Sequence, residues 1–127
     1  MKLLGSGIDI VQVDRIGALH EKYGTRFVEK ILHDRELDEL REHLEADSFL
    51  AKRFAVKEAT AKALGLGIGK SLSFKDIYVE HDELGKPELV FTQECRLRLK
   101  LEKVNALLTI ADEKAYAVAH VLMYSEG

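Results

Sequence analysis

The sequence has little cysteine, no long apolar run and no excess of positive charge. Its one cysteine, Cys95, cannot form an internal disulfide, so we expect a reducing compartment, the cytoplasm. The longest uncharged apolar stretch, residues 115–124, is too short for a transmembrane helix, which needs about 18 residues, and no signal-peptide core is present. Lysine and arginine number 19 against 22 acidic residues, so no nucleic-acid or membrane partner is expected.

The composition that remains is that of a folded globular chain. Of 127 residues, 46% are hydrophobic and 32% are charged, and the only proline is Pro87. No linker, internal repeat or low-complexity tract interrupts the sequence. We therefore expect one domain that spans residues 1–127 and buries its own core.

The hydrophobic spacing predicts one strand and several helices in the first half. Residues 3–11 alternate as a strand with Leu4, Ser6, Ile8 and Ile10 on one face and Gly5, Gly7, Asp9 and Val11 on the other. Short helices are expected at residues 14–23, at residues 25–31 with Thr25 as a cap, and from an Asp34 cap along Leu37, Leu40 and Leu44. A long helix is expected from Asp47 or Ser48 to Leu64, capped by Gly65.

Strands are expected in the second half. A glycine-rich loop (66–71) leads to a strand (74–81), a turn (82–87) and a return strand (89–91). Residues 92–103 predict a helix, although the alternation of residues 96–101 also permits a strand, and residues 106–111 and 115–122 predict a closing pair of strands. This order favours an α+β fold with a mainly antiparallel sheet over a doubly wound parallel sheet.

Several common catalytic patterns are missing. Gly69-Lys70-Ser71 looks like the end of a phosphate-binding P-loop, but that motif needs a glycine at position 64, where leucine stands, and a preceding strand. The loop is expected to end the long helix, although its backbone N–H groups could hold a phosphate. The histidines lack metal-ligand spacing, no serine lies in a nucleophile elbow, and Cys95 is expected in the core, so covalent catalysis is not expected.

Charged residues at two places could carry chemistry. Asp9 lies among apolar residues, so it is either a strand-end carboxylate that accepts backbone hydrogen bonds or a metal ligand. On the long helix, Glu58 and Lys62 are four residues apart, as are Arg53 and Lys57. Glu58 and Lys62 are either an exposed helix ion pair, which the pattern alone favours, or part of a site in which Asp9 and Glu58 bind Mg²⁺ and the cations at positions 53, 57 and 62 bind phosphates.

Three segments in order carry a resemblance to a known family. They are Gly-Ile-Asp-Ile-Val-Gln-Val-Asp-Arg-Ile (residues 7–16), Phe-Leu-Ala-Lys-Arg-Phe-Ala-Val-Lys-Glu-Ala-Thr-Ala-Lys-Ala-Leu-Gly (residues 49–65) and Asp-Glu-Leu-Gly-Lys-Pro (residues 82–87). Together they resemble the motifs of the small bacterial 4'-phosphopantetheinyl transferases, and the second is the most diagnostic. The resemblance covers nearly the whole chain.

The resemblance implies an activity and a set of partners. Members of this family are α+β proteins that transfer the 4'-phosphopantetheine arm of coenzyme A to a serine of apo acyl carrier protein, releasing adenosine 3',5'-bisphosphate. Compact members use Mg²⁺, usually serve fatty acid biosynthesis, and form homotrimers with each active site between neighbouring chains. The expected partners are therefore coenzyme A, apo acyl carrier protein and further copies of this chain.

The resemblance also implies roles for individual residues. Asp9 and Glu58 match the metal-binding acids, which would be catalytic together with Lys62, a lysine near the transferring phosphate. The positions that match the coenzyme A site are Arg53 at the nucleotide end, Lys62, and Gly65 at the start of the cleft-lining loop. Pro87 matches a position that reaches a cofactor bound mainly to a neighbouring chain. The positions that match the surface facing the acidic carrier protein are Arg15, Lys22 and Arg26. The alternative is that these are solvated helix charges, because the acids at positions 14, 21 and 29 nearly balance the basic residues of this segment.

One segment departs from the family pattern. Many members have a histidine on a late strand that helps to bind the nucleotide, whereas residues 109–112 here are Thr-Ile-Ala-Asp, and Asp112 would repel a phosphate. Two alternatives stay open on the sequence. One is a Mg²⁺-dependent hydrolase of nucleotide pyrophosphates, in which water replaces the serine. The other is a non-catalytic module that binds coenzyme A or an acidic partner.

Overall fold

Residues 1–126 are described by a computed structural model and contain five strands, five α-helices and one 3-10 helix, η1. In chain order these are β1 (Lys2–Gln12), α1 (Val13–Tyr23), α2 (Thr25–Ile31), α3 (Asp34–Glu42), α4 (Ala46–Leu64), η1 (Phe74–Asp76), β2 (Ile77–His81), β3 (Pro87–Phe91), α5 (Gln93–Arg98), β4 (Val104–Asp112) and β5 (Tyr116–Ser125). The strand pairs are antiparallel, which confirms the expected α+β class.

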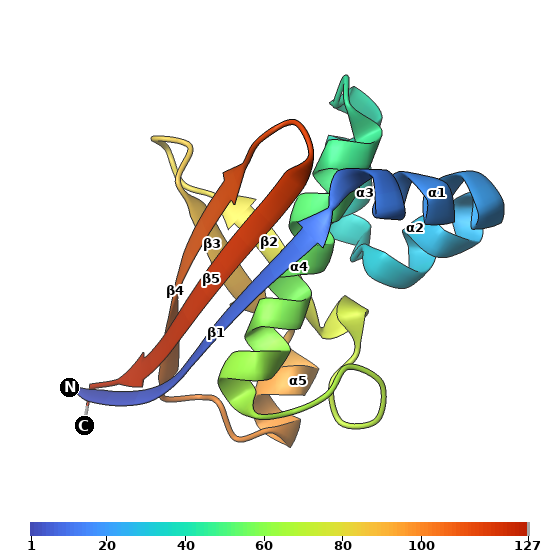
Figure 1. The fold of residues 1–127 in the computed structure, drawn as a ribbon. Helices are drawn as coiled ribbons and strands as arrows, with labels where there is room; N and C mark the ends of the chain where they lie inside the picture. The colour runs from blue at the N-terminus through green and yellow to red at the C-terminus, as the bar shows by residue number, and fades with distance from the viewer. Residues whose placement is uncertain (127) are drawn as a thin grey trace.

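The strands form a main sheet and a separate hairpin (Figure 1). The main sheet has the order β1-β5-β4, so the first strand of the chain lies beside the last, and β2 pairs with β3. A register shift between Leu3 and Gly5 interrupts the β1–β5 ladder near its start. Within residues 1–126, no helix combines the length and the apolarity that crossing a membrane requires.

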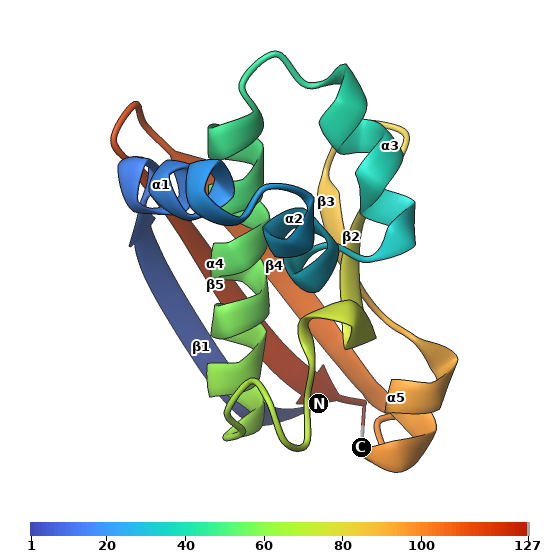
Figure 2. The same cartoon turned by 90° about the vertical axis from the view of Figure 1, so that its right-hand side faces the viewer.

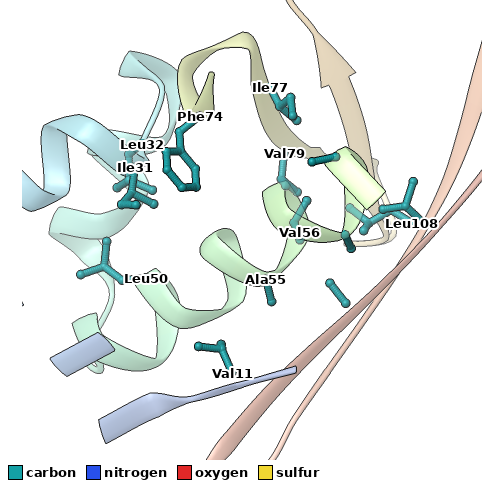
Figure 3. Packing of buried hydrophobic residues seen from close by; sticks show 14 of the residues in the cluster. Val11, Ile31, Leu32, Leu50, Ala55, Val56, Phe74, Ile77, Val79 and Leu108 are labelled. Carbon is teal, nitrogen blue, oxygen red and sulfur yellow. The ribbon is translucent and has the colours of Figure 1, made fainter. Parts of the chain in front are cut away.

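The central helix α4 packs between the main sheet and the rest of the chain. In Figure 2, α1, α2 and α4 all lie in front of the β1-β5-β4 sheet. Figure 3 shows Ala55 and Val56 of α4 between Val11 of β1 and Val79 of β2, and all four residues are buried. Burial of this apolar surface is the main favourable contribution to folding.

Two glycines let β1 and α4 touch along their backbones. A Cβ atom on Gly5 would lie 2.1 Å from the carbonyl oxygen of Ala63, and one on Gly7 would lie 2.0 Å from that of Ala59. A side chain at either position would therefore push the helix away from the strand. Asp9 follows two residues later on the same face of β1, so this contact brings it to α4.

Several boundaries differ from the expected ones because other residues cap the helices. The caps of α2 and α3 are Gly24 and His33, so the predictions of Thr25 and Asp34 as caps were wrong. The His33 ring accepts a hydrogen bond from the backbone N–H of Arg35. The stripe along α3 ends before Leu44, which lies beyond the helix and is fully exposed.

Three other elements begin or end at unexpected residues. α4 begins slightly earlier than predicted, at Ala46. Residues 74–76 form η1 instead of the start of a strand, because the Asp76 carboxylate accepts a hydrogen bond from the backbone N–H of Ser73. α5 ends at Arg98, and Lys100 has a positive φ of 58°, so residues 96–101 do not form the strand that their alternation permits.

Candidate active site

The backbone contact between β1 and α4 brings Asp9 and Lys62 together. Lys62 Nζ donates one hydrogen bond to Asp9 Oδ1 at 3.0 Å and another to the carbonyl oxygen of Ile8 at 2.9 Å. The Asp9 side chain is 16% exposed and that of Lys62 is 54% exposed. Lys62 therefore pairs with an acid on β1, and the prediction of an exposed pair with Glu58 on its own helix was wrong.

Glu58 belongs to the same group of charges. Burial raises the pKa of Glu58 above its ordinary value, and the negative charge of Asp9 raises it further, against the opposing charges of Lys62 and Arg15. We call Asp9, Glu58 and Lys62 the acid–lysine cluster. Arg15 of α1 lies within electrostatic reach of this cluster, which its predicted role in carrier binding did not indicate.

The acid–lysine cluster has the donor set for a hard cation and a phosphate. Asp9 and Glu58 supply carboxylate oxygens from two different elements. Among residues 1–126, no group of three histidine, cysteine or acidic side chains could hold a metal ion. Two carboxylates suit Mg²⁺, which usually takes its other ligands from substrate phosphates and water. Lys62 can stabilise negative charge on such a phosphate.

Lys57 does not join this cluster, and the prediction that it binds a phosphate was wrong. The side chain is wholly buried, and its Nζ donates to Glu36 Oε1 and to the carbonyl oxygen of Ile31, both at 2.7 Å. Burial lowers the pKa of Lys57, while the Glu36 carboxylate opposes this effect. Glu36 also accepts a hydrogen bond from the backbone N–H of Val79, so this ion pair joins α3, α4 and β2.

Arg53 also contacts the buried Glu36, and it contacts the partly exposed Glu39 at the edge of this group of charges. Its Nη2 donates to Glu39 Oε2 at 2.9 Å, its Nε lies 3.5 Å from Glu36 Oε2, and its guanidinium carbon lies 4.5 Å from the centre of the Phe49 ring. Burial lowers the pKa of Arg53, while Glu39 and Glu36 oppose this effect. The sequence analysis missed Glu36 and Glu39, because partners from a different helix leave no local signal.

A pocket of about 270 Å³ joins Arg53 to Pro87 and Asp112. Arg53, the position matched to the nucleotide end of coenzyme A, thus lies beside Pro87 and beside Asp112, which departs from the family pattern. Asp112 accepts a hydrogen bond from Ser48 at 3.4 Å, and the Nζ of Lys52 lies 3.6 Å from its carboxylate. Lys52 therefore balances much of the negative charge that would repel a phosphate.

Gly65 and the predicted carrier-binding residues lie elsewhere on the chain. Gly65 ends α4 with a left-handed φ of 71°, as predicted for a C-terminal cap. Lys22 and Arg26 are exposed. Arg26 borders an apolar pocket of about 440 Å³, whose lining includes Leu19, Tyr23, Phe27, Phe54 and Phe74.

The acid–lysine cluster could bind a divalent cation together with a phosphate-bearing substrate, and the comparisons with known proteins assign the class. A family model described as the 4'-phosphopantetheinyl transferase superfamily matches residues 5–120, and the chain belongs to this superfamily.

Individual relatives share most of the sequence and the fold. The holo-(acyl-carrier-protein) synthase of Escherichia coli O1:K1 / APEC is 45% identical over 126 residues, which cover 98% of this chain and 100% of that protein. The crystal structure of the Neisseria meningitidis synthase has a TM-score of 0.90 and 38% identity, over 97% of this chain and 99% of that one. The Bacillus anthracis synthase, in complex with CoA (3',5'-ADP), has a TM-score of 0.83 and 36% identity, over 99% of this chain and 100% of that one. These similarities confirm the resemblance and favour the transferase over the hydrolase and the binding module.

Proposed function

We propose that this chain transfers the 4'-phosphopantetheine arm of coenzyme A to a serine of apo acyl carrier protein. The products are holo acyl carrier protein and adenosine 3',5'-bisphosphate, and the proposed setting is fatty acid biosynthesis in the cytoplasm. The observation that carries this proposal is the acid–lysine cluster, in a chain 45% identical over nearly its whole length to a holo-(acyl-carrier-protein) synthase. The CoA (3',5'-ADP) in the Bacillus anthracis relative supports coenzyme A as the donor.

Intact-mass spectrometry of apo acyl carrier protein tests this activity directly. The carrier would be incubated with this protein, coenzyme A and Mg²⁺, with an EDTA control. A Mg²⁺-dependent gain of one phosphopantetheine group is the expected result. Cleavage of coenzyme A without a gain in carrier mass would favour the hydrolase, and neither change would favour the binding module.

Mg²⁺ is the proposed metal, with Asp9 and Glu58 as its protein ligands. Two observations support the fit. The donors are carboxylate oxygens, which Mg²⁺ prefers, and the repulsion from Asp9 that raises the pKa of Glu58 is one that a nearby divalent cation would relieve. When bound, Mg²⁺ would neutralise charge on the pyrophosphate of coenzyme A and orient it.

The residues of the chain itself position the donor and stabilise the charge that develops. The serine oxygen forms a bond to the phosphorus that carries the pantetheine arm, and the bond from that phosphorus to the nucleotide oxygen breaks. Lys62 stabilises the negative charge that grows on the leaving adenosine 3',5'-bisphosphate. The serine proton passes to Glu58 or to a water molecule beside it. Arg53, Pro87 and the loop that begins at Gly65 hold the coenzyme A.

Arg15, Lys22 and Arg26 are the proposed contacts for the carrier protein. All three are exposed, and they lie on α1 and at the start of α2. The apolar pocket beside Arg26 adds a surface that could bury an apolar side chain. Basic residues around an apolar pocket suit an acidic partner, because attraction between opposite charges speeds encounter while apolar contact adds affinity.

The outer face of the main sheet supports the proposal of a homotrimer. Leu4, Ile8 and Ile10 of β1 are 44%, 59% and 63% exposed, and Leu107 of β4 is 47% exposed. In Figure 2, α1, α2 and α4 lie on the opposite side of the sheet. An apolar surface of this kind on a sheet usually indicates a protein interface. We therefore propose that copies of the chain associate through this face, with the active sites between neighbouring chains.

A further inference from the structure

The guanidinium of Arg53 is covered on the sides that the structure describes. The side chain is only 4% exposed, with the Phe49 ring against one face, Glu36 behind Nε, and Glu39 on Nη2. Nε is buried and makes no hydrogen bond to any part of residues 1–126. A phosphate could reach this group only if one of the covering side chains moved.

Glu39 is the covering group that can leave. Phe49 and Glu36 are buried in the core, and Glu36 is fixed by Lys57 and by the backbone N–H of Val79. Glu39, by contrast, is 39% exposed, and its side chain has no other hydrogen bond or ion pair among residues 1–126. Because Lys57 already balances the charge of Glu36, the loss of Glu39 would leave Arg53 with an accessible and poorly balanced positive charge.

The surroundings of Arg53 favour an anion in place of Glu39. The pocket that contains Arg53 and Glu39 is also lined by His43 and His81, and by Asp112, whose charge Lys52 opposes at 3.6 Å. A phosphate ester offers three oxygens and more negative charge than a carboxylate, so it can bind the planar guanidinium through two hydrogen bonds.

We propose that Glu39 is a displaceable counter-ion. In the free protein it holds the guanidinium of Arg53, and it gives this group up to a phosphate of coenzyme A when the nucleotide binds. This inference rests on the proposed function, and it adds a residue that sets the affinity for the donor and for the departing product. Glu39 thus competes with the ligand, so its neutralisation strengthens nucleotide binding.

The test compares Glu39→Gln with the wild-type protein in calorimetric titrations of adenosine 3',5'-bisphosphate. The variant is expected to bind roughly five-fold more tightly, because the ligand no longer has to displace a partly exposed ion pair. Glu42→Gln is the matched control. It removes the same charge from the same helix, but Glu42 forms no ion pair among residues 1–126. The affinity of this variant for the bisphosphate should therefore stay close to that of wild type. Adenosine, which has no phosphate, should bind both variants and wild type alike.

Kinetics give a second readout that a structural role would not change. The KM of Glu39→Gln for coenzyme A should fall, while its KM for the carrier protein stays the same. Equal or weaker binding of the bisphosphate by Glu39→Gln would overturn the inference, as would an equal gain in Glu42→Gln. If wild type modifies the carrier and Glu39→Gln shows no gain in affinity, the inference fails alone. If wild type neither binds the nucleotide nor modifies the carrier, the proposed function fails as well.

Discussion

Glu58 of the acid–lysine cluster is held in a state that costs stability. Glu58 is partly buried next to Asp9, and the one ion pair in the cluster joins Lys62 to Asp9 and not to Glu58. The ionised form of Glu58 is therefore disfavoured in the folded protein. Strain of this kind is common where a site is arranged for a ligand and not for the free chain.

Glu58→Gln should stabilise the metal-free protein in a pH-dependent way. The pKa of Glu58 is raised in the folded state, so ionisation lowers the free energy of unfolding as pH rises from the unfolded value of about 4.3 through the folded value. In EDTA, the variant should melt a few degrees above wild type at about pH 8 and close to wild type at about pH 4. Thermal unfolding across this range, with Glu42→Gln as a control, measures the difference. A difference that did not change with pH would contradict the assignment.

Asp9→Asn should remove the response of the protein to Mg²⁺. A cation that binds only the folded state raises the melting temperature with its concentration. Wild type, with adenosine 3',5'-bisphosphate present, should melt at a higher temperature as Mg²⁺ is added, and Asp9→Asn should not respond. Glu83→Gln, which changes an exposed acid in the β2–β3 turn, should respond like wild type. If the melting temperature of Asp9→Asn rose with Mg²⁺ as it does in wild type, Asp9 would be excluded as a ligand of the metal.

At the scale of elements, the contact between β1 and α4 decides where the reactive residues lie. The alternation of residues 3–11 predicts correctly that Gly5, Gly7 and Asp9 share a face, and Gly65 is correctly predicted to end α4. The sequence does not show that α4 rests on the backbone of β1. The only sign of this contact is that two residues of the strand, Gly5 and Gly7, have no side chain. Nor does it show that Lys57 is buried against Glu36, because an i,i+4 pattern is the same on an exposed helix and a buried one.

Gly7→Ala should separate these two elements. The new Cβ would lie 2.0 Å from the carbonyl oxygen of Ala59, so α4 must shift away from β1 at a cost of about 1–3 kcal/mol. A shift of about 1 Å between Asp9 and the α4 residues should reduce kcat by roughly 100-fold. Glu102→Ala, at an exposed residue with no part in the proposed site, is the control. Near-normal turnover in Gly7→Ala would show that the contact does not set the site geometry.

The whole molecule presents two surfaces with different chemistry, an apolar sheet face and a charged helical face formed by α1 and α2. Ile10→Glu tests the first. Its side chain is exposed in the single chain, so the fold should be retained, but the charge should disrupt association through the sheet. Sedimentation velocity should show monomers. Turnover should also fall, because the proposed active sites lie between neighbouring chains. Leu84→Glu is a control at an exposed apolar residue of the β2–β3 turn, away from the sheet face. A wild-type sedimentation profile for Ile10→Glu would exclude this face as the interface.

The role of the charged helical face in carrier binding is better tested at Arg26 than at Arg15. Arg15 affects the charge of Glu58, so its reversal would alter both docking and chemistry. Arg26→Glu should raise the KM for the carrier protein by roughly five-fold or more and leave the KM for coenzyme A nearly unchanged, because rim charges act mainly on encounter. Added salt should narrow the gap between the variant and wild type. Equal effects on both substrates would contradict a docking role.

The alternation along β1 has a consequence for insertions and deletions. Ile8 and Asp9 are neighbours in sequence but point to opposite faces of the sheet, one outward and one toward α4. Loss or gain of a single residue in β1 would exchange the two faces, so that an acid would enter the apolar surface and an isoleucine would face Lys62. We expect libraries of length variants to retain changes in the exposed turn around Leu84 and to lose almost every change within β1.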